Sequence, residues 1–503
     1  MENIIIGKYA LESLTTGMYS DSLVVFREYI QNSADAIDDA CKKGVLKKIE
    51  SKIEVQLFPI EGNVIIKDNG TGISYQYAEK TLISIGNSKK VLGSARGFRG
   101  IGRLAALGYC GKLIFETSYT GEEIGTRLII DAKELSKRLT LEENFDISAE
   151  EVLKEVYFIE QFQEQKYTHY FNVIMKDVSP DSELINYEAV YEYLIQTAPV
   201  AYDAEKFTWG KEIKRRFKNE GYNIPDYNIY LSYAGNTVPI YKAYSDEFFI
   251  DKRGNIVDRI KDIQIIKLID LKGNTSAYGW IPTLNYMGSI YDKSFKGLRI
   301  RKGNILVGDG QTLNICFKDP RFNGWTLGEI FVIDDKHLIP NARRDNFEKN
   351  STYFIFIEQI RNIAASIIKE IRSVSVARNT EQLEIFDKQK ELESNVEVTR
   401  NLRDTGLGEK TILRKRLINV RNALNQFSSI EDTDLYNKEI AFDEIDMLIG
   451  KLQGTTAYKS INSMQNLSKI EKRTLEKVFD TIVSVKSDDA EVLIDSILKV
   501  FVC

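Results

Sequence analysis

The segment REYIQNSADAIDDA (27–40) places polar groups along one side of an otherwise apolar helix. Glu28, Asn32, Asp35 and Asp39 follow one another at intervals of four, three and four residues, so they share one helix face. The remaining positions that should be covered are Phe26, Tyr29, Ile30, Ala34, Ile37 and Ala40. Such a stripe indicates either a polar pocket on a mostly buried helix or only the solvated side of an amphipathic helix. In a pocket, Glu28 suits a general base, and the Asn32 carbonyl oxygen suits Mg²⁺.

DNGTG (68–72) stands at the end of an apolar strand pattern that begins at residue 63. A buried Asp68 can accept a hydrogen bond from an exocyclic amine such as that of adenine. Gly70 and Gly72 would let the backbone approach a flat ligand without Cβ clashes. The same letters are typical of an Asn-Gly hairpin turn, so this motif alone leaves both interpretations open.

GFRGIG (97–102) is a glycine-rich loop that leads into a helix pattern. Free N–H groups and the positive end of the helix dipole at such a place suit a phosphate, although a flexible loop is the simpler interpretation. The loop lacks the Gly-Lys-Ser/Thr ending of a P-loop. It also lacks the well-formed preceding strand of a dinucleotide-binding fingerprint.

Taken in order, the three motifs resemble those of the GHKL ATPases, the class of gyrase, heat-shock protein 90 chaperones, histidine kinases and MutL. The matching residues are Glu28, Asn32, Asp35 and Ala36 for ExxxNxxDA, Asp68, Gly70 and Gly72 for DxGxG, and Gly97, Gly100 and Gly102 for GxxGxG. The resemblance covers about residues 5 to 185. It implies the Bergerat fold, a mixed sheet with helices on one face.

The resemblance also implies roles for single residues. Asp68 would hold adenine, Asn32 would hold Mg²⁺, and Glu28 would activate the attacking water. Residues 83–96 would form the lid over ATP. The implied nucleotide-binding set is Asn32, Asp35, Asp68, Gly70, Gly72, Ser88, Lys89, Gly97, Gly100, Ile101, Gly102 and Thr168. ATP and Mg²⁺ are the expected ligands.

The fourth motif of the family is a Gly-Thr pair on a later strand, and here the sequence offers two candidates. Gly125-Thr126 matches the letters but comes early in the chain. Thr168 stands at a more suitable distance, ahead of the strand pattern at 169–175, although Tyr167 replaces the glycine. We expect Thr168 to be the equivalent residue.

The branch of the family can be narrowed with the two histidines, His169 and His337. Neither lies on a two-helix segment ahead of the ATPase, where a histidine kinase carries its phosphoacceptor, so a kinase is not expected.

NARRD (341–345) resembles the loop of heat-shock protein 90 middle domains whose arginine reaches the γ-phosphate. Arg344 takes the arginine position, with Arg343 as the alternative, and a surface turn is the structural alternative. An arginine from another domain can stabilise charge on the transferred phosphoryl group.

The expected fold class is α/β, an α+β sandwich in three parts. Residues 1–185 form the ATPase domain, 186–375 an α/β middle, transducer-like domain with the arginine loop, and 376–503 a helical region that dimerises the chain. Residues 133–165 are expected to be an inserted helical segment, because Glu, Lys and Leu dominate them.

Composition limits the partners. The net charge of the 503 residues is -5, so no overall basic field favours nucleic acid or an acidic membrane. Four cysteines without CxxC spacing fit a reducing cytoplasm, and no apolar run is long enough for a membrane span. Three short basic clusters, at 211–218, 296–303 and 413–421, are either solvated faces or a local nucleic-acid surface.

The sequence therefore predicts a cytoplasmic, Mg²⁺-dependent ATPase that works as a homodimeric molecular clamp resembling heat-shock protein 90. A protein client is the first expectation. A nucleic-acid clamp of the MORC or MutL type, with a role in bacterial phage defence, is the alternative, because GFRGIGRLAALG (97–108) looks like the MORC-type bacterial proteins. A third alternative is a nucleotide-gated scaffold.

Overall fold

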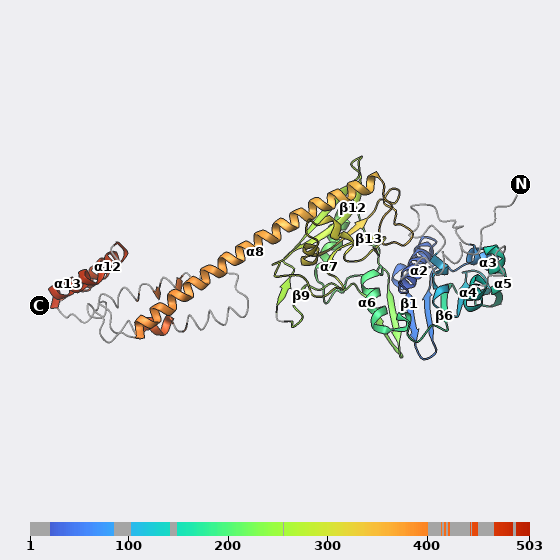
Figure 1. The fold of residues 1–503 in the computed structure, drawn as a ribbon, viewed down its shortest axis with the longest axis horizontal. Helices are drawn as coiled ribbons and strands as arrows, with labels where there is room; N and C mark the ends of the chain where they lie inside the picture. The colour runs from blue at the N-terminus through green and yellow to red at the C-terminus, as the bar shows by residue number, and fades with distance from the viewer. Residues whose placement is uncertain are drawn as a thin grey trace. The chain divides into compact units, whose positions relative to one another are not determined.

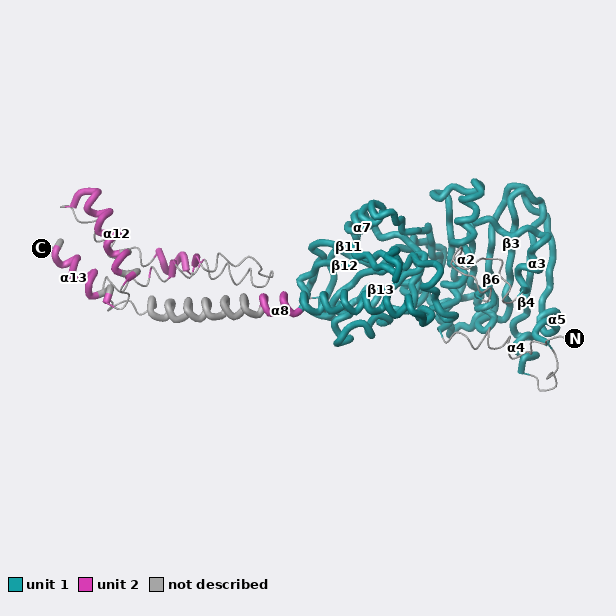
Figure 2. The backbone as a smooth tube through the Cα atoms, turned by 90° about the horizontal axis from the view of Figure 1, so that it is seen from above, with its two compact units in different colours: residues 1–371 teal, residues 372–503 magenta. Residues whose placement is uncertain are grey.

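The structure, a computed structural model, consists of two compact units, residues 1–371 and residues 372–503 (Figures 1 and 2). It describes residues 21–84, 102–140, 148–254, 256–400, 414, 417–418, 421–422, 443, 445–450, 467–485 and 489–502. The first unit contains two sheets with their helices, which we call the first and second lobes. The second unit is helical wherever it is described in regular structure.

The first lobe is built on an eight-stranded mixed sheet in the order β5-β4-β3-β6-β2-β1-β7-β8. Its strands are β1 (Ile53–Phe58), β2 (Asn63–Asp68), β3 (Lys112–Ser118), β4 (Ile124–Asp131), β5 (Tyr157–Gln163), β6 (Tyr170–Lys176), β7 (Ile229–Tyr233) and β8 (Asn236–Pro239). All neighbours are antiparallel except β1 and β7. The α/β fold class expected from the sequence is confirmed.

Helices and sheet share one apolar core. Its helices are α2 (Val24–Lys42), α3 (Tyr75–Ile83), α4 (Ala132–Thr140), α5 (Ala149–Val156) and α6 (Tyr187–Thr197), with the 3₁₀ segments η2 (Gly102–Gly108) and η4 (Glu183–Ile185). A third 3₁₀ segment, η1 (Lys48–Glu50), has no buried residue. The period-2 pattern of β1 buries Ile53, Val55 and Leu57 as its sequence predicts. The apolar residues of α2 that were expected to be covered are also buried.

The expectation of helix from 133 to 165 is wrong at its end. Helices α4 and α5 occupy most of the described part, but YFIEQFQ forms the edge strand β5, paired with β4. Four of its seven residues are aromatic or β-branched, and such side chains favour a strand.

The chain passes more than once between the lobes. After α6 it forms α7 (Trp209–Asn219), whose Arg216 donates a hydrogen bond to the carbonyl of Ile263 in the second lobe. It then returns as β7 and β8 to the edge of the first sheet, where β7 pairs with β1. The first sheet therefore extends past residue 185, where the sequence suggests that the ATPase domain ends.

The second lobe carries a five-stranded sheet in the order β11-β12-β15-β13-β14 and a separate two-stranded ribbon, β9–β10. The strands are β9 (Glu247–Phe249), β10 (Val257–Arg259), β11 (Asp262–Ile269), β12 (Thr275–Thr283), β13 (Gly297–Lys302), β14 (Ile305–Val307) and β15 (Leu327–Val332). Two 3₁₀ segments, η5 (Thr312–Cys316) and η6 (Pro320–Trp325), lie between β14 and β15 in the chain. Strand β15 is buried along its whole length, as a central strand requires.

Helix α8 (Ser351–Arg400) starts in the first unit and continues into the second. The second unit also contains α12 (Lys469–Val485) and α13 (Ala490–Val502), where the sequence predicts amphipathic helices. None of the helices that the structure describes has the length and apolar character needed to cross a membrane.

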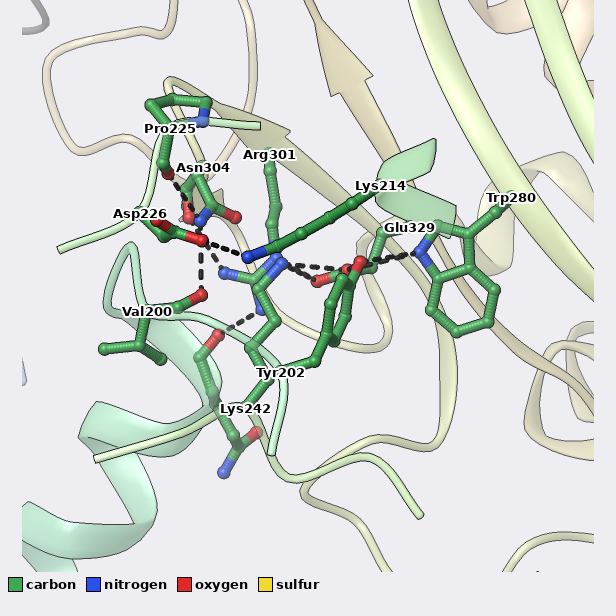
Figure 3. A network of polar contacts seen from close by, with 11 residues as sticks. Val200, Tyr202, Lys214, Pro225, Asp226, Lys242, Trp280, Arg301, Asn304 and Glu329 are labelled. Atoms are coloured by element: carbon green, nitrogen blue, oxygen red, sulfur yellow. Dashed lines mark hydrogen bonds and ion pairs between the residues drawn. The ribbon is translucent and has the colours of Figure 1, made fainter. Parts of the chain in front are cut away.

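A buried polar network ties the second sheet to the end of α6 (Figure 3). Glu329 on β15 accepts hydrogen bonds from Tyr202 Oη (2.5 Å) and Lys242 Nζ (2.9 Å), and it forms an ion pair with Arg301. Arg301 Nη2 in turn donates to the carbonyl of Gln196 in α6 (2.8 Å). Burial favours the neutral acid, but Arg301 and Lys242 outweigh it and lower the pKa of Glu329 to about 2. One carboxylate thus balances two buried cations.

Two of the three basic clusters noted in the sequence, 296–303 and 211–218, lie in described parts of the second lobe and α7. Arg299 and Arg301 of β13 are each only 1% exposed, because both faces of this strand are covered. In α7, Arg215 and Arg216 pair with Glu212 of the same helix. The arginines of these two clusters are thus either buried or paired with a carboxylate, which disfavours an open basic surface there.

We expect Glu329→Gln to lower the free energy of unfolding by roughly 3–5 kcal/mol, because it leaves Lys242 and Arg301 buried without their counter-charge. The denaturation midpoint in urea measures this loss. The exposed Glu205→Gln is the matched control and should change little. Equal midpoints for the two variants would contradict the central role of Glu329.

Candidate active site

The polar stripe of α2 lies mostly inside the first lobe. Glu28 and Asp35 are each 8% exposed and Asn32 is half-buried, whereas Asp39 at the end of the stripe is exposed. Three of the four expected residues therefore face the interior. Burying two carboxylates on one helix is unfavourable unless partners or a ligand compensate, so the stripe is more than a solvated face.

Asp68 ends β2 and turns into the DNGTG loop. Its Oδ1 accepts the N–H of Gly70 (2.9 Å). Burial raises the pKa of Asp68 to about 7, against a lowering by hydrogen bonds from the Ser33 side chain and the Gly70 backbone. Ser33 lies beside Asn32 on α2, so the first two sequence motifs meet at this carboxyl group.

The loop after Asp68 is fixed between α2 and the sheet. The N–H of Thr71 donates to the carbonyl of Ala36 in α2 (3.2 Å), and the N–H of Ile73 donates to Thr117 Oγ1 on β3 (2.8 Å). Gly72 has φ +64°, and a Cβ atom there would lie 1.9 Å from the Ser118 carbonyl oxygen. Only glycine fits this position, which explains the last letter of the motif.

His169, the residue before β6, supports the same loop. Its Nδ1 lies 2.8 Å from the carbonyl oxygen of Gly70, so Nδ1 carries the proton and donates. Gly70 is thereby held on both sides, by Asp68 at its N–H and by His169 at its carbonyl. Sequence reasoning missed His169, Ser33 and Thr117; His169 and Ser33 adjoin residues that it did select, and Thr117 carries no pattern that distinguishes it.

The described end of the third motif lies against the proposed general base. A Cβ atom on Gly102 would stand 2.2 Å from Glu28 Oε2, so the absence of a side chain lets η2 approach α2 here. Tyr29 Oη, one residue from Glu28, donates to the carbonyl of Arg103 (2.8 Å). The remaining expected residues of the lid and glycine loop lie outside the described residues: Ser88, Lys89, Gly97, Gly100 and Ile101.

The two candidates for the fourth motif occupy different strands. Thr168 lies two residues before the start of β6, the neighbour of β2, and its carbonyl accepts a hydrogen bond from Ser118 Oγ (3.0 Å). Thr126 lies on β4, which β3 and β6 separate from β2. Its buried hydroxyl has no hydrogen-bond partner among the described residues. Thr168 therefore lies next to the strand that pairs with β2, which ends at Asp68, whereas Thr126 lies two strands further away.

The arginine loop of the second lobe is a closed turn. A bridge between Pro340 and Phe347 joins its ends, and the N–H of Asn341 donates to the carbonyl of Asn346 (2.8 Å). Arg344 lies at its tip with φ +56°, a left-handed conformation that is unfavourable for a residue other than glycine. The N–H of Gly308 donates to the carbonyl of Arg344 (2.8 Å) and anchors the tip to the end of β14.

This loop meets the polar stripe of α2. Arg344 Nε lies 3.3 Å from Glu28 Oε1, and Arg27 Nη2 donates to the carbonyl of Arg343 (2.8 Å). The side chains of Glu28 and Arg344 are 10% and 13% exposed, whereas Arg343 is exposed. Of the two arginines considered from the sequence, the structure brings Arg344 to Glu28. Arg27, which the sequence analysis did not select, holds the loop from the other lobe.

The site offers few protein ligands for a metal ion. No group of three or more His, Cys, Asp or Glu side chains that could hold a metal ion occurs among the described residues. Mg²⁺ does not need such a cage, since it commonly keeps several waters and binds one or two protein oxygens together with phosphates. The half-buried Asn32, one turn from Glu28, fits a single oxygen ligand of this kind.

Comparison with known proteins agrees with this geometry. Residues 19–157 match the family model described as "Histidine kinase-, DNA gyrase B-, and HSP90-like ATPase". The match contains α2, the DNGTG loop and η2, and it supports the GHKL superfamily and ATP binding for this part of the chain. No curated protein matches the chain.

Asp68 should make stability depend on pH. Because folding raises its pKa from 3.8 to about 7, this group contributes most stability below about pH 4, and the contribution is lost as the pH rises to about 7. Asp68→Asn lacks this loss, so its free energy of unfolding should rise relative to that of wild type across the same range, by up to a few kcal/mol. Urea unfolding without nucleotide measures it, with the exposed Asp181→Asn as control. A pH-independent difference would contradict the buried carboxyl.

His169→Ala should weaken nucleotide binding roughly three- to tenfold, because one hydrogen bond that orders the Gly70 loop is lost. Titration with ADP measures the dissociation constant, and His337→Ala, at an exposed histidine bonded to Asp334, is the control. The turnover number at saturating ATP should stay near that of wild type. Unchanged ADP affinity would show that His169 does not support the loop.

Proposed function

We propose that the protein is an Mg²⁺-dependent ATPase in which the second lobe supplies an arginine to the ATP site of the first lobe. The observation that carries this proposal is the 3.3 Å approach of Arg344 Nε to Glu28 Oε1. A GHKL-type domain alone would account for ATP binding. An arginine that arrives from 316 residues further along the chain and reaches the proposed base favours hydrolysis coupled to lobe arrangement.

In this proposal the adenine lies beside Asp68. Its exocyclic amine would donate to the carboxylate and stabilise the ionised form that burial disfavours. Ser33 and Gly70 orient the carboxylate, and His169 and Thr117 keep the loop behind it in place. Thr168, ahead of the neighbouring strand β6, is the proposed fourth-motif residue.

The phosphate end would lie between Glu28, Asn32 and the third motif. Asn32 would hold the Mg²⁺ ion, which neutralises phosphate charge when bound. Glu28 would take the proton of the water that attacks the γ-phosphorus, and the products are ADP and phosphate. Asp35, Gly70, Gly72 and Gly102 would shape the rest of the pocket.

Arg344 has two possible anions in such a site. In the structure it lies beside Glu28, and a bound γ-phosphate would be the second anion. A γ-phosphate carries more negative charge than one carboxylate, so we infer that ATP draws Arg344 toward the phosphate and frees Glu28 to act as base. Arg27 would keep the loop docked, because it binds the Arg343 carbonyl and not the Arg344 side chain.

The wider proposal is a homodimeric molecular clamp resembling heat-shock protein 90 and acting on a protein client. The helical region is the proposed dimer contact, since its helices expose aliphatic side chains to solvent: Ile470, Val485, Val492 and Val500.

Glu28→Ala should lower the turnover number for ATP by roughly 10²–10⁴-fold and leave ATP binding in place, because the proton acceptor is lost. Arg344→Ala should lower it by roughly 10²-fold or more, since one stabilising charge on the transferred group is lost. Arg343→Ala is the matched control, one position away with an exposed side chain. Steady-state hydrolysis with Mg²⁺, together with ATP titration, measures both quantities.

Two results would overturn the proposal. If Arg344→Ala and Arg343→Ala turn over equally, the arginine loop has no catalytic part. If wild type binds ATP but hydrolyses none, and Glu28→Ala changes nothing, the protein is a nucleotide-gated scaffold.

A further inference from the structure

Strand β5 leaves one edge of the first sheet open. It is the last strand of that sheet and pairs on one side only, with β4 in a continuous antiparallel register. All seven of its residues are half-buried or exposed, and Phe158 is 59% exposed. A strand in such a position offers free N–H and C=O groups to another chain.

The hydrogen-bond pattern shows which backbone groups of β5 point outward. Just past the strand, the N–H of Glu164 donates to the carbonyl of Glu123, its opposite residue in the same register (3.0 Å). Bonded and non-bonded residues alternate in an antiparallel pair, so the even-numbered residues of β5 bond to β4. The odd-numbered residues that follow Tyr157 therefore turn their N–H and C=O groups away from β4: Ile159, Gln161 and Gln163. Within the described part of the chain, these outward groups make no backbone hydrogen bond.

The other edges of the two sheets are better protected. Strand β8, at the far end of the first sheet, has four residues and ends in Pro239, and the three residues of β14 are all buried. At the end of β11, the side chain of Gln359 accepts the N–H of Ile269 (3.0 Å) and donates to its carbonyl (2.8 Å). Strand β5 contains no proline, lysine or bulge, and its one charge, Glu160, is paired with Arg127 of β4.

The open edge has a fixed position without a partner. Tyr157 Oη donates to the Glu79 side chain of α3 (2.7 Å), and Ile159 packs against the apolar core of the lobe. Phe162 lies over Gly125 of β4, where a Cβ atom would stand 2.4 Å from its ring. A partner would therefore meet a preformed edge, which lowers the entropic cost of binding.

The side chains of β5 indicate what a partner strand should carry. Ile159 packs against the core, and side chains alternate along a strand, so its neighbours point to the other face of the sheet. These neighbours are Phe158, Glu160 and, one pair further, Phe162. An antiparallel partner would best place apolar side chains opposite the two phenylalanines and a basic side chain opposite Glu160.

The charge of this face also favours a basic partner. Arg127 Nε lies 2.5 Å from Glu116 Oε1, and Arg127 Nη1 lies 2.5 Å from Glu160 Oε1, so two carboxylates share one guanidinium. The two helices before the strand, α4 and α5, carry four basic and four acidic residues and add no net charge. The charged residues at the other ends of β4 and β5 leave the acidic excess in place: Glu123, Asp131, Glu164 and Lys166.

A second copy of the chain fits this edge less well. The two-fold pairing that joins all seven residues of one β5 to those of another sets the Glu160 side chains of the two copies directly opposite each other. Like charges in that position are unfavourable. A polypeptide with a basic residue at this place has no such repulsion and gains a partner for the second carboxylate.

We propose that the outer edge of β5 binds an extended polypeptide segment as a further antiparallel strand of the first sheet. The segment would alternate apolar side chains with a basic one between them. Main-chain hydrogen bonds would supply affinity for many sequences, and the side chains opposite Phe158, Glu160 and Phe162 would supply preference. The inference rests on the proposed function in one respect, because it takes such a segment to belong to the protein client of the clamp.

The test is fluorescence anisotropy of the full chain with a labelled peptide as long as β5, with valine at its second and sixth positions, lysine at its fourth and threonine elsewhere. N-methylation at the third and fifth positions removes two N–H groups that would face β5 and should weaken binding at least about tenfold. N-methylation at the second and sixth positions is the matched control, since those N–H groups face away from β5, and should change the affinity little.

Two variants test the same edge from the side of the protein. Gln161→Pro lacks an outward N–H that the β4–β5 pairing does not use, so it should bind the peptide roughly tenfold more weakly than its matched control Gln161→Ala. Glu160→Lys should weaken binding of the lysine peptide roughly three- to tenfold and strengthen binding of a peptide with glutamate at the fourth position. Urea midpoints show whether the proline variant is folded, and the N-methylated peptides decide the question on wild type if it is not.

Equal affinity of the two N-methylated peptides would overturn the proposal, and so would a lack of binding by every peptide. If Gln161→Pro instead reduces self-association in sedimentation and no peptide binds, the edge belongs to a second copy and the proposal is also wrong. Binding needs neither ATP nor hydrolysis, so Glu28→Ala should bind the peptide like wild type. Failure of the ATPase proposal and failure of this one can therefore be distinguished.

Discussion

The ion pair between Glu28 and Arg344 joins the two ends of the first unit, and the functional account depends on it. Glu28 lies on a buried helix of the first lobe, and Arg344 comes from a loop of the second. Neither charge is stable in the interior without a partner. The first lobe supplies Glu28 and also Arg27, whose Nε lies 3.8 Å from Glu28 Oε1, and the second lobe adds Arg344 to this charged site.

The contact between the two lobes depends on the path of the chain, which crosses from one lobe to the other more than once. Strands β7 and β8 follow α7 but complete the first sheet, and Lys242, just after β8, pairs with Glu329 in the second sheet. Arg301 on β13 binds the carbonyl of Gln196 in α6. The repeated crossing of the chain and the buried polar network (Figure 3) therefore connect the lobes and hold the arginine loop opposite α2. In the proposed clamp, a movement of one lobe relative to the other would change the distance between Arg344 and Glu28.

Local sequence patterns predicted the features that depend on a few neighbouring residues, such as a helix face or a glycine turn. The intervals of Glu28, Asn32 and Asp35 gave the inward helix face, and the glycines of DNGTG marked a loop that only glycine can form at Gly72. Contacts set by tertiary structure could not be read in this way. Thr117 on β3 and His169 just before β6 support the loop although both are distant from it in the sequence. Strand β7 joins a sheet that the sequence assigned to another domain. The basic cluster at 296–303 suggested a surface, but Arg299 and Arg301 are buried and bond to Gln196 of α6.

A double-mutant cycle on the turnover number for ATP, with Glu28→Ala, Arg344→Ala and both together, tests the central claim most directly. If both side chains act on one transferred phosphoryl group, the double variant should be hardly slower than Glu28→Ala alone, because residues that act as a unit are not additive. If instead the two losses multiply, or if only one substitution has an effect, Arg344 and Glu28 do not serve the same reaction, and the proposed coupling of the lobes to hydrolysis is wrong.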